Sequence, residues 1–318
     1  MIKIEKILVA KDFSESAEAA LHFAIALAVR YGAALHVLYA QVIHGDAFDA
    51  PIYPAGHTER IRAKMKEVAA QMVKKHKDAD LDRLAVENVI VRDVAAGPAI
   101  VRYATEHEID LIVMGTHGNR GLRHFLIGSV AEEVVRLAPC PVLTVRAREE
   151  AVVEVQGSTS ILVPVDFSRH ALEAVRYARE VADTLGGRVD LLHVIEEALH
   201  PAFYNTGAFS IYDIQPNLKE HAVLHLERLF EEAGGPAVEV RFLVRSGQAS
   251  HEVVAYAEEA ESSMILMSTH GLSGLAHFFI GSVAERVVRT APCPVFTIKS
   301  FGRSLLPDRA EEEAAVAE

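Results

Sequence analysis

KILVAKDFSESAEAALHFAIALAVRYGAALHVL, residues 6–38, returns in altered form as SILVPVDFSRHALEAVRYAREVADTLGGRVDLLHVI, residues 160–195. Both stretches hold a short apolar run, the tripeptide Asp-Phe-Ser, an amphipathic stretch, a glycine and a second apolar run containing His-Val. The first run, Ile7–Ala10, is typical of a buried strand. Ser14 can cap a helix, and Gly32 can stop it. Each stretch therefore predicts a strand, a helix and a second strand.

A second repeat closes each half of the chain. GTHGNRGLRHFLIGS at residues 115–129 matches STHGLSGLAHFFIGS at residues 268–282, and both continue into Ala-Pro-Cys-Pro-Val. Between Gly118–Arg146 and Gly271–Lys299 we count 20 identities over 29 positions. Since domains commonly span about 100–200 residues, the 318-residue chain is predicted to be a duplicated domain. The predicted domains are 1–147 and 158–300, followed at 301–318 by an acidic tail that we expect to be disordered.

Strand and helix signals alternate through each copy, and such alternation predicts parallel strands joined by right-handed crossovers. We expect two copies of a doubly wound, five-stranded parallel-sheet α/β domain, Rossmann-like, with strand order 3-2-1-4-5. The fifth strands, PVLTVR and PVFTIK, are apolar sheet edges, and we expect them to pair so that one chain forms its own dimer. In the first copy the later strands are expected at Leu35–Tyr39, Val86–Val91, Asp110–Met114 and Pro141–Val145, with helices at about 58–77, 98–106 and 129–137. In the second copy the strands are expected near Ile161–Val165, Val189–Ile195, Val238–Val244, Met264–Met267 and Val295–Ile298.

The composition excludes some classes of partner. The formal net charge of −12 weighs against nucleic acid and against anionic membrane surfaces, because both bind basic faces. No apolar run is long enough to span a membrane, and the first residues lack the order of a secretory signal peptide. Cys140 and Cys293 occupy the same place in the two copies, and we expect them to be small buried residues rather than a disulfide framework. These features indicate a cytoplasmic protein.

The glycine loops suggest a binding site for phosphate. In the first copy, Gly115 and Gly118 are followed, after nine residues, by Gly128-Ser129. Glycines let backbone N–H groups approach an anion, and the helix that follows presents N–H groups at its first turn. A purely structural turn is the alternative. Neither loop continues as Gly-Lys-Ser/Thr, which argues against a P-loop.

Two features of this region have structural alternatives. Ser129 with Glu132 fits a capping box, as does the matching pair of the second copy. Asp12 and Asp166 follow the first strand of each copy, where they could accept hydrogen bonds from ribose hydroxyls or serve as turn residues. If strands one and four are neighbours, the aspartates and the glycine loops face each other beyond the carboxyl ends of the strands. Doubly wound sheets bind ligands at that place.

The motifs ILVPVDFS, LLHVI, the Gly-x-x-Gly-x9-Gly-Ser loop and APCPV resemble those of the universal stress protein family, and the chain is similar to its tandem, two-domain type. Members with this loop bind ATP, so the resemblance implies an adenine-nucleotide site in each copy, with Mg²⁺ left open as an accompanying ion. In the first copy the resemblance implies Asp12 for the ribose, Val37 beside the adenine, and Met114, Gly115, Gly118, Gly128, Ser129 and Val130 for the sugar and phosphates. In the second copy it implies Asp166, Val194, Met267, Ser268, Gly271, Gly281, Ser282 and Val283.

The two loops differ from each other. Ser268 replaces Gly115, and we expect its Cβ to crowd the sugar–phosphate path. The first loop carries Arg120 and Arg123 where the second has serine and alanine. Arginines there could pair with terminal phosphates or stay solvated. We therefore expect the first copy to bind nucleotide more tightly than the second.

The histidines give only weak support for a metal site. His221 and His225 share a face of a predicted helix and could hold zinc together with His200, but no cysteine or carboxylate completes a recognised spacing. We expect a solvated helix face and predict no metal site. His36 and His193 fall in the second strand of each copy, where we expect them to be hydrogen-bonded within the sheet.

The sequence supports three interpretations of function. The first is a nucleotide-dependent binding or signalling module of the stress response that acts on an unknown protein partner. The second is a slow ATP hydrolase or nucleotidyl transferase, although no general base, arginine finger or Walker-type metal site can be assigned. The third is an interaction scaffold with vestigial sites. We prefer the first, expect a weak ATPase at most, and leave further homodimer formation open.

Overall fold

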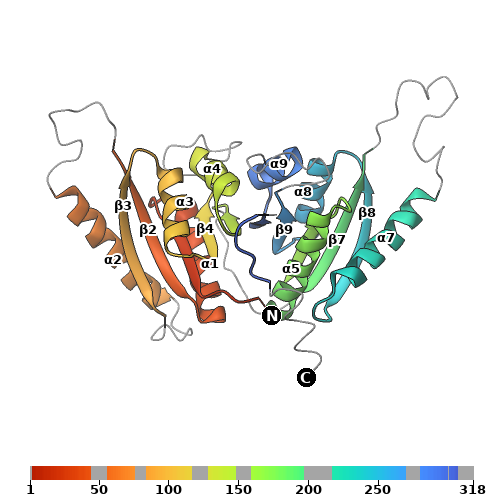
Figure 1. The fold of residues 1–318 in the computed structure, drawn as a ribbon, viewed down its shortest axis with the longest axis horizontal. Coiled ribbons are helices and arrows are strands. Elements are labelled where there is room, and N and C mark those ends of the chain that lie inside the picture. Colours follow the sequence, from red (N-terminus) through yellow and green to blue (C-terminus); the bar gives the residue numbers. More distant parts are fainter. Residues whose placement is uncertain are drawn as a thin grey trace, which may run out of the picture. The chain divides into compact units, whose positions relative to one another are not determined.

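The computed structural model describes residues 2–43, 56–75, 84–116, 128–147, 159–196, 217–269, 280–299 and 301–306. The chain divides into two compact units (Figure 1). The first unit holds residues 3–153 and 301–318, and the second unit holds residues 1–2 and 154–300. The division falls between the predicted domains 1–147 and 158–300.

Strands and helices alternate along the first unit. Its strands are β1 (Lys6–Ala10), β2 (Ala34–Val42), β3 (Val86–Asp93), β4 (Leu111–Gly115) and β5 (Val142–Val145). Its helices are α1 (Glu15–Tyr31), α2 (His57–Lys75), α3 (Ala96–Glu106) and α4 (Ser129–Leu137). The strands pair in parallel in the order β3-β2-β1-β4-β5, which confirms the predicted order.

The second unit repeats this arrangement. Its strands are β6 (Ser160–Pro164), β7 (Arg188–Ile195), β8 (Glu239–Ser246), β9 (Met264–Ser268) and β10 (Val295–Ile298). Its helices are α5 (Arg169–Leu185), α7 (Leu218–Ala233), α8 (Ala249–Glu259) and α9 (Ser282–Thr290). The order β10-β9-β6-β7-β8 is again all parallel, so each unit has the Rossmann-like fold. The pairing of the two fifth strands stays a prediction.

The first helix of each unit begins and ends in the same way. Ser14 and Ser168 are the N-caps of α1 and α5, and each hydroxyl oxygen accepts a hydrogen bond from the amide three residues further on. Gly32 and Gly186 end these helices with φ of 67°, a left-handed conformation that glycine adopts without steric cost. The predicted cap at Ser14 and stop at Gly32 are confirmed.

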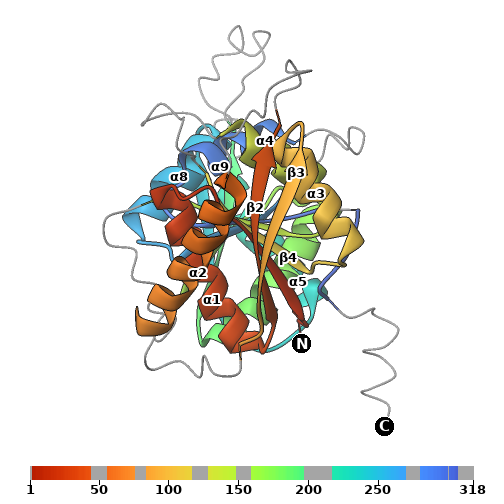
Figure 2. The same cartoon turned by 90° about the vertical axis from the view of Figure 1, so that its left-hand side faces the viewer.

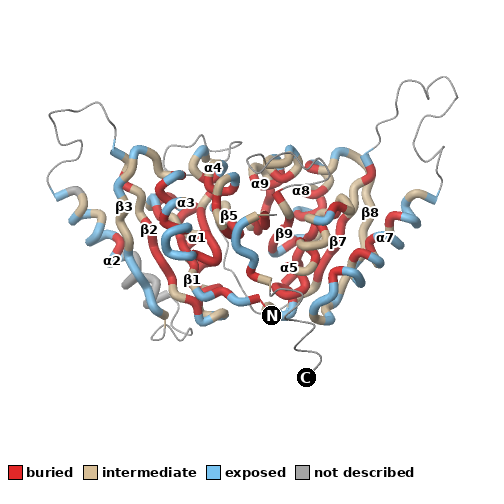
Figure 3. Tube along the Cα trace, in the orientation of Figure 1, coloured by how far each residue is buried: buried red, intermediate tan, exposed pale blue. Residues whose placement is uncertain are grey.

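The helices on the two faces of the sheet leave a place beyond the carboxyl ends of the strands uncovered. In the first unit, α1 packs on β1 and β4, whereas α3 packs on β2, β3 and α4. Figure 2 shows α1 and α2 on one side of these strands and α3 on the other, and Figure 3 shows the buried strands between them. Because strand order reverses between β1 and β4, the helices that follow these two strands leave toward opposite faces. The carboxyl ends of β1 and β4 therefore border a place that no crossover helix covers.

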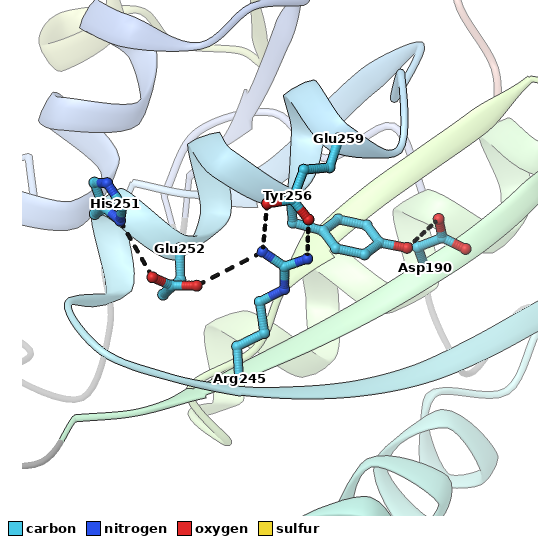
Figure 4. A network of polar contacts seen from close by, with 6 residues as sticks. All are labelled: Asp190, Arg245, His251, Glu252, Tyr256 and Glu259. Atoms are coloured by element: carbon cyan, nitrogen blue, oxygen red, sulfur yellow. Dashed lines mark hydrogen bonds and ion pairs between the residues drawn. The ribbon is translucent and has the colours of Figure 1, made fainter.

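Different polar contacts hold the third helix of each unit on its sheet. In the first unit, His36 of β2 hydrogen-bonds the hydroxyl of Tyr103 on α3 at 2.8 Å. In the second unit, Asp190 occupies the same register position and accepts a hydrogen bond from Tyr256 of α8 at 3.0 Å (Figure 4). Burial raises the pKa of Tyr103 to about 12 and also raises that of Tyr256. Both hydroxyls therefore keep their protons at neutral pH.

Arg245 of β8 adds ion pairs to this contact in the second unit. Its guanidinium lies 3.6 Å from the carboxylate of Glu252 and 2.5 Å from that of Glu259, both on α8 (Figure 4). It also lies over the ring of Tyr256, with its central carbon 4.9 Å from the ring centroid. Because the Glu259 side chain is largely exposed, we expect this pair to contribute little to stability.

Segments near both ends of the chain are held in place. The N–H of Ile2 donates to the carboxylate of Glu180 in the second unit at 3.1 Å. Arg303 contacts the buried carboxylate of Asp110 in the first unit at 3.0 Å, and Leu305 is buried. Within the tail that we expected to be disordered, an arginine and a leucine therefore anchor residues 301–306. Residues 307–318 lie outside the described residues.

Candidate functional site

The carboxyl ends of the first and fourth strands lie side by side in each unit. Ala10 of β1 pairs with Met114 of β4 in parallel register, and β6 pairs with β9 in the same sense. The expectation that these strands are neighbours is confirmed. Asp12 is exposed at this edge and Asp166 is half-buried. Each aspartate therefore lies at the same carboxyl end of the sheet as the segment that leads into its glycine loop.

The turn after each aspartate fixes its carboxylate. Oδ1 of Asp12 accepts hydrogen bonds from the backbone N–H and the hydroxyl of Ser14, at 2.9 and 2.6 Å. Oδ1 of Asp166 accepts one from the N–H of Ser168 at 3.0 Å. A carboxylate has about four acceptor sites, so the turn uses only part of its capacity. The turn and ligand interpretations of these aspartates are therefore compatible.

Glycines cap the helices that follow the two loops. Gly128 is the N-cap of α4 and Gly281 is the N-cap of α9, so Ser129 and Ser282 are the first helical residues. The capping-box interpretation is wrong, because it needs each serine at the cap position, one residue before the helix. We expected the glycine amides to face a ligand, but the N–H of Gly128 donates to a backbone carbonyl at 2.7 Å, and that of Gly281 at 2.8 Å.

The amides of the first helical turn are better placed to bind an anion. The first N–H groups of an α-helix have no partner within the helix, and among the described residues no side chain caps α4 or α9. Ser129 and Ser282 are exposed, and Val130 and Val283 are half-buried. The helix dipole adds a partial positive charge at this end. For an anion at the candidate site, the first-turn amides are therefore better donors than the amides of the two glycines.

Gly115, at the end of β4, has a packing role. A Cβ at this position would lie 2.6 Å from Oγ of Ser16 and 2.9 Å from the backbone nitrogen of Ala17, at the start of α1. Glycine therefore lets α1 approach the end of β4. The second unit has Ser268 here. By the same geometry its Cβ faces the first helix rather than the loop, which removes the reason to expect crowding of the sugar–phosphate path.

Replacing Gly115 by alanine should destabilise the first unit by about 1–2 kcal/mol, because the added methyl group overlaps the first turn of α1. The matched control is Ser268→Ala, which keeps an existing Cβ and should change stability by less than about 1 kcal/mol. Urea unfolding of the two variants beside the parent chain measures both values. Equal losses from the two substitutions would show that the close approach at Gly115 is not what glycine provides.

The strand pairing corrects one predicted site residue. Val37 occupies the register position that Leu191 has in the second unit, so Val37 and Val194 are not counterparts. Val37 is buried inside the sheet, 5% exposed, whereas Val194 is half-buried near the end of β7. The counterpart of Val194 is Ala40, since each lies 28 residues after its aspartate (194 − 166 and 40 − 12). Ala40 therefore replaces Val37 in the candidate site.

The remaining predicted residues divide into two groups. Met114 and Met267 are buried at the penultimate positions of β4 and β9, beneath the candidate site. Gly118 and Gly271 lie outside the described residues, as do Arg120 and Arg123.

The zinc interpretation gains no support. Within the described residues there is no group of three or more His, Cys, Asp or Glu side chains placed to hold a metal ion, and His200 lies outside them. His225 lies edge-on against the ring of Phe167, with centroids 5.7 Å apart. Nδ1 of His193 donates to the carbonyl of Val165 at 2.8 Å. Nδ1 of His36 is hydrogen-bonded to the hydroxyl of Tyr103 at 2.8 Å. The expectation that the two strand histidines are hydrogen-bonded is confirmed.

Sequence reasoning missed an ion pair between a buried lysine and a partly exposed glutamate beside Asp12. The side chain of Lys11 is 1% exposed and pairs with Glu18 of α1, whose side chain is 42% exposed. Among the described residues its ammonium finds no other hydrogen-bond acceptor. Burial lowers the pKa of Lys11. The available signal was a lysine at a position where the second unit has Val165.

Two stretches of the chain match one family model. Residues 3–146 and 158–299 each match the model of the Universal stress protein family. The chain belongs to this family. It is a tandem member, with one universal stress protein domain in each half, as the resemblance of its motifs implied.

Curated relatives are similar to half of the chain. A universal stress protein of Methanocaldococcus jannaschii is 30% identical over 139 residues, which cover 44% of this chain and 81% of the relative. A putative universal stress protein of Staphylococcus aureus strain USA300 is 35% identical over 153 residues, which cover 47% of this chain and 88% of the relative. These relatives therefore have about the length of one unit.

Solved structures share the fold over most of the chain. A universal stress protein of Archaeoglobus fulgidus matches with a TM-score of 0.62 and 24% identity, covering 92% of this chain and 98% of that one. A putative universal stress protein of Pseudomonas aeruginosa matches with a TM-score of 0.61 and 16% identity, covering 99% and 98%. At these identities the likeness concerns the fold. In the part of the chain that the structure describes, no helix combines the length and apolar character needed to cross a bilayer.

Proposed function

We propose that each unit binds an adenine nucleotide, ATP, at the carboxyl edge between its first and fourth strands, as a binding module of the stress response. One observation carries the proposal. In both units an aspartate follows the first strand and the fourth strand is the parallel neighbour of the first. The helix after the fourth strand begins at a glycine N-cap, and no side chain among the described residues caps it. Doubly wound sheets bind ligands at this reversal of strand order. Membership of the universal stress protein family supports the choice of ATP.

The proposed contacts follow from the chemistry of the groups present. Asp12 and Asp166 would accept hydrogen bonds from ribose hydroxyls. The first-turn amides of α4 and α9, with the hydroxyls of Ser129 and Ser282, would donate to phosphate oxygens. A Mg²⁺ ion brought with ATP would bind phosphate oxygens and water, which are its usual ligands.

We also propose that nucleotide binding changes the affinity of this protein for a partner protein. ATP then acts as a regulatory ligand rather than as a substrate for hydrolysis. A module of this kind needs no general base at the site. Neither Cys140 nor Cys293 forms a disulfide, which fits a reducing compartment such as the cytoplasm.

Calorimetric titration of ATP should reveal two sites, with the first unit the tighter. Arg120 and Arg123 belong to the first loop only, and a charge-assisted contact to phosphate is stronger than a neutral one. Changing them to the residues of the second loop, Arg120→Ser and Arg123→Ala together, should weaken the first site about tenfold and make the two affinities similar. The reciprocal variant, Ser273→Arg with Ala276→Arg, should strengthen the second site. Unchanged affinities in both variants would contradict the asymmetry, and no heat of binding in the parent protein would contradict the proposed function.

A further inference from the structure

Phe13 and Phe167 have an unusual backbone conformation. Their φ angles are 65° and 61°, in the left-handed region that glycine favours. A bulky side chain in this region costs about 1–3 kcal/mol, and such strain persists only when surrounding contacts hold it. Both phenylalanines lie between the site aspartate and the N-cap serine of the first helix. The same strained residue therefore occurs at the same place in both units.

Ring contacts hold each phenylalanine in this conformation. In the first unit, the ring of Phe13 packs against Tyr39 of β2 with centroids 5.5 Å apart, and the ammonium of Lys64 on α2 lies 4.3 Å from the centroid of the Phe13 ring. In the second unit, the ring of Phe167 packs against His193 of β7 at 4.5 Å. His225 of α7 lies edge-on against the same ring at 5.7 Å. The anchors thus come from the second strand and the helix that follows it, although the side chains differ.

The left-handed turn determines where the carboxylate lies. It folds the chain back so that Oδ1 of Asp12 meets the N–H of Ser14 at 2.9 Å, and Oδ1 of Asp166 meets the N–H of Ser168 at 3.0 Å. With the ring anchored, the aspartate is already ordered before a ligand arrives. A side chain that is ordered in advance loses less conformational entropy on binding.

We propose that Phe13 and Phe167 are positioning residues for nucleotide binding. Each ring, anchored on the second strand, holds the strained turn that presents Asp12 or Asp166 to the ribose. This inference rests on the proposed function and adds to it a residue that need not touch the nucleotide. It predicts that glycine, which adopts the same φ without strain, cannot replace phenylalanine.

The test compares Phe13→Gly, Phe13→Tyr and Asp12→Ala in a protein whose second unit carries Asp166→Ala, so that the first site alone reports. Phe13→Gly should weaken ATP binding about threefold to tenfold, because the cost of ordering the aspartate side chain returns to the binding step. Phe13→Tyr keeps the ring and should bind like the parent. Asp12→Ala should abolish binding at the first site, which sets the largest loss that Phe13→Gly can reach. A loss in Phe13→Tyr equal to that in Phe13→Gly would overturn the inference, as would parent-like affinity of Phe13→Gly.

A second readout needs no nucleotide. The hydrogen-exchange rate of the Ser14 amide reports its bond to Asp12, and it should rise in Phe13→Gly but not in Phe13→Tyr. Urea unfolding controls for folding, because relief of strain offsets part of the lost ring packing. If the parent protein binds no ATP, the proposed function fails, while the exchange rate still shows whether the ring holds the carboxylate. An unchanged Ser14 rate in Phe13→Gly would contradict positioning whatever the affinity.

Discussion

Replacing Arg179 by alanine is expected to lower the free energy of unfolding of the second unit by about 2–4 kcal/mol. The guanidinium of this residue on α5 donates to the carbonyl of Phe230 at 2.8 Å, to that of Gly235 at 3.1 Å and to that of Pro236 at 2.8 and 3.0 Å. It also lies over the ring of Phe230 at 4.1 Å. These carbonyls belong to the last turn of α7 and the segment after it, where helix geometry leaves acceptors without partners. Without the arginine, several half-buried acceptors lose their donors together.

Two further substitutions separate hydrogen bonding from charge and volume. Arg179→Lys keeps the positive charge but cannot donate in the planar fork that reaches three carbonyls, so it should recover less than half of the loss. Arg228→Ala removes an exposed arginine from α7 and should cost less than about 0.5 kcal/mol. Urea unfolding followed by a probe in the second unit measures all three. A loss in Arg179→Ala no larger than that in Arg228→Ala would show that the carbonyls find other donors.

The second large effect concerns the pair of Lys11 and Glu18. Glu18→Leu should destabilise the first unit by about 2–3 kcal/mol, because it leaves a buried ammonium without its counter-ion. Lys11→Val should cost less than about 1 kcal/mol, since the remaining carboxylate is 42% exposed and can be solvated. The double variant should match the parent or exceed it by about 1 kcal/mol, as replacing a whole buried ion pair by apolar residues is often neutral or stabilising.

The second unit shows that this fold accommodates apolar residues at the positions of Lys11 and Glu18. It carries Val165 and Leu172 at the positions of Lys11 and Glu18, and Val165 is 4% exposed. The double variant Lys11→Val with Glu18→Leu therefore gives the first unit the residues of the second. Thermal unfolding of the two single variants and the double variant completes a double-mutant cycle. Additive losses would mean that the two side chains are not coupled, contrary to the contact between them.

The fold could be predicted because its signals are local and occur twice. The apolar run Ile7–Ala10, the cap at Ser14 and the stop at Gly32 each act within a few residues, and the same pattern returns at 160–195. Parallel strands joined by right-handed crossover helices permit few topologies, so the alternation favoured a doubly wound sheet. The anchored segment 301–306 was not predictable, because its contacts reach Asp110, which is far away in sequence.

The site could be predicted less completely, since its details depend on register. The similar motifs HVL and HVI suggested that Val37 is the counterpart of Val194. Counting residues from each aspartate shows that the counterpart of Val194 is Ala40. The cap at Gly128 depends on whether the helix begins at Ser129 or one residue later, and sequence patterns do not resolve one residue. Nothing in the sequence marks Phe13 as strained, because the ring contact that holds it comes from another strand.

Native mass spectrometry of the intact chain with ATP tests the central claim most directly, because it counts bound nucleotides per molecule. Two adenine-nucleotide sites predict up to two bound ATP in the parent protein, one in Asp12→Ala, one in Asp166→Ala and none in the double variant. Absence of bound ATP in the parent at millimolar ATP, or two bound ATP in the double variant, would contradict the sites proposed at the two sheet edges.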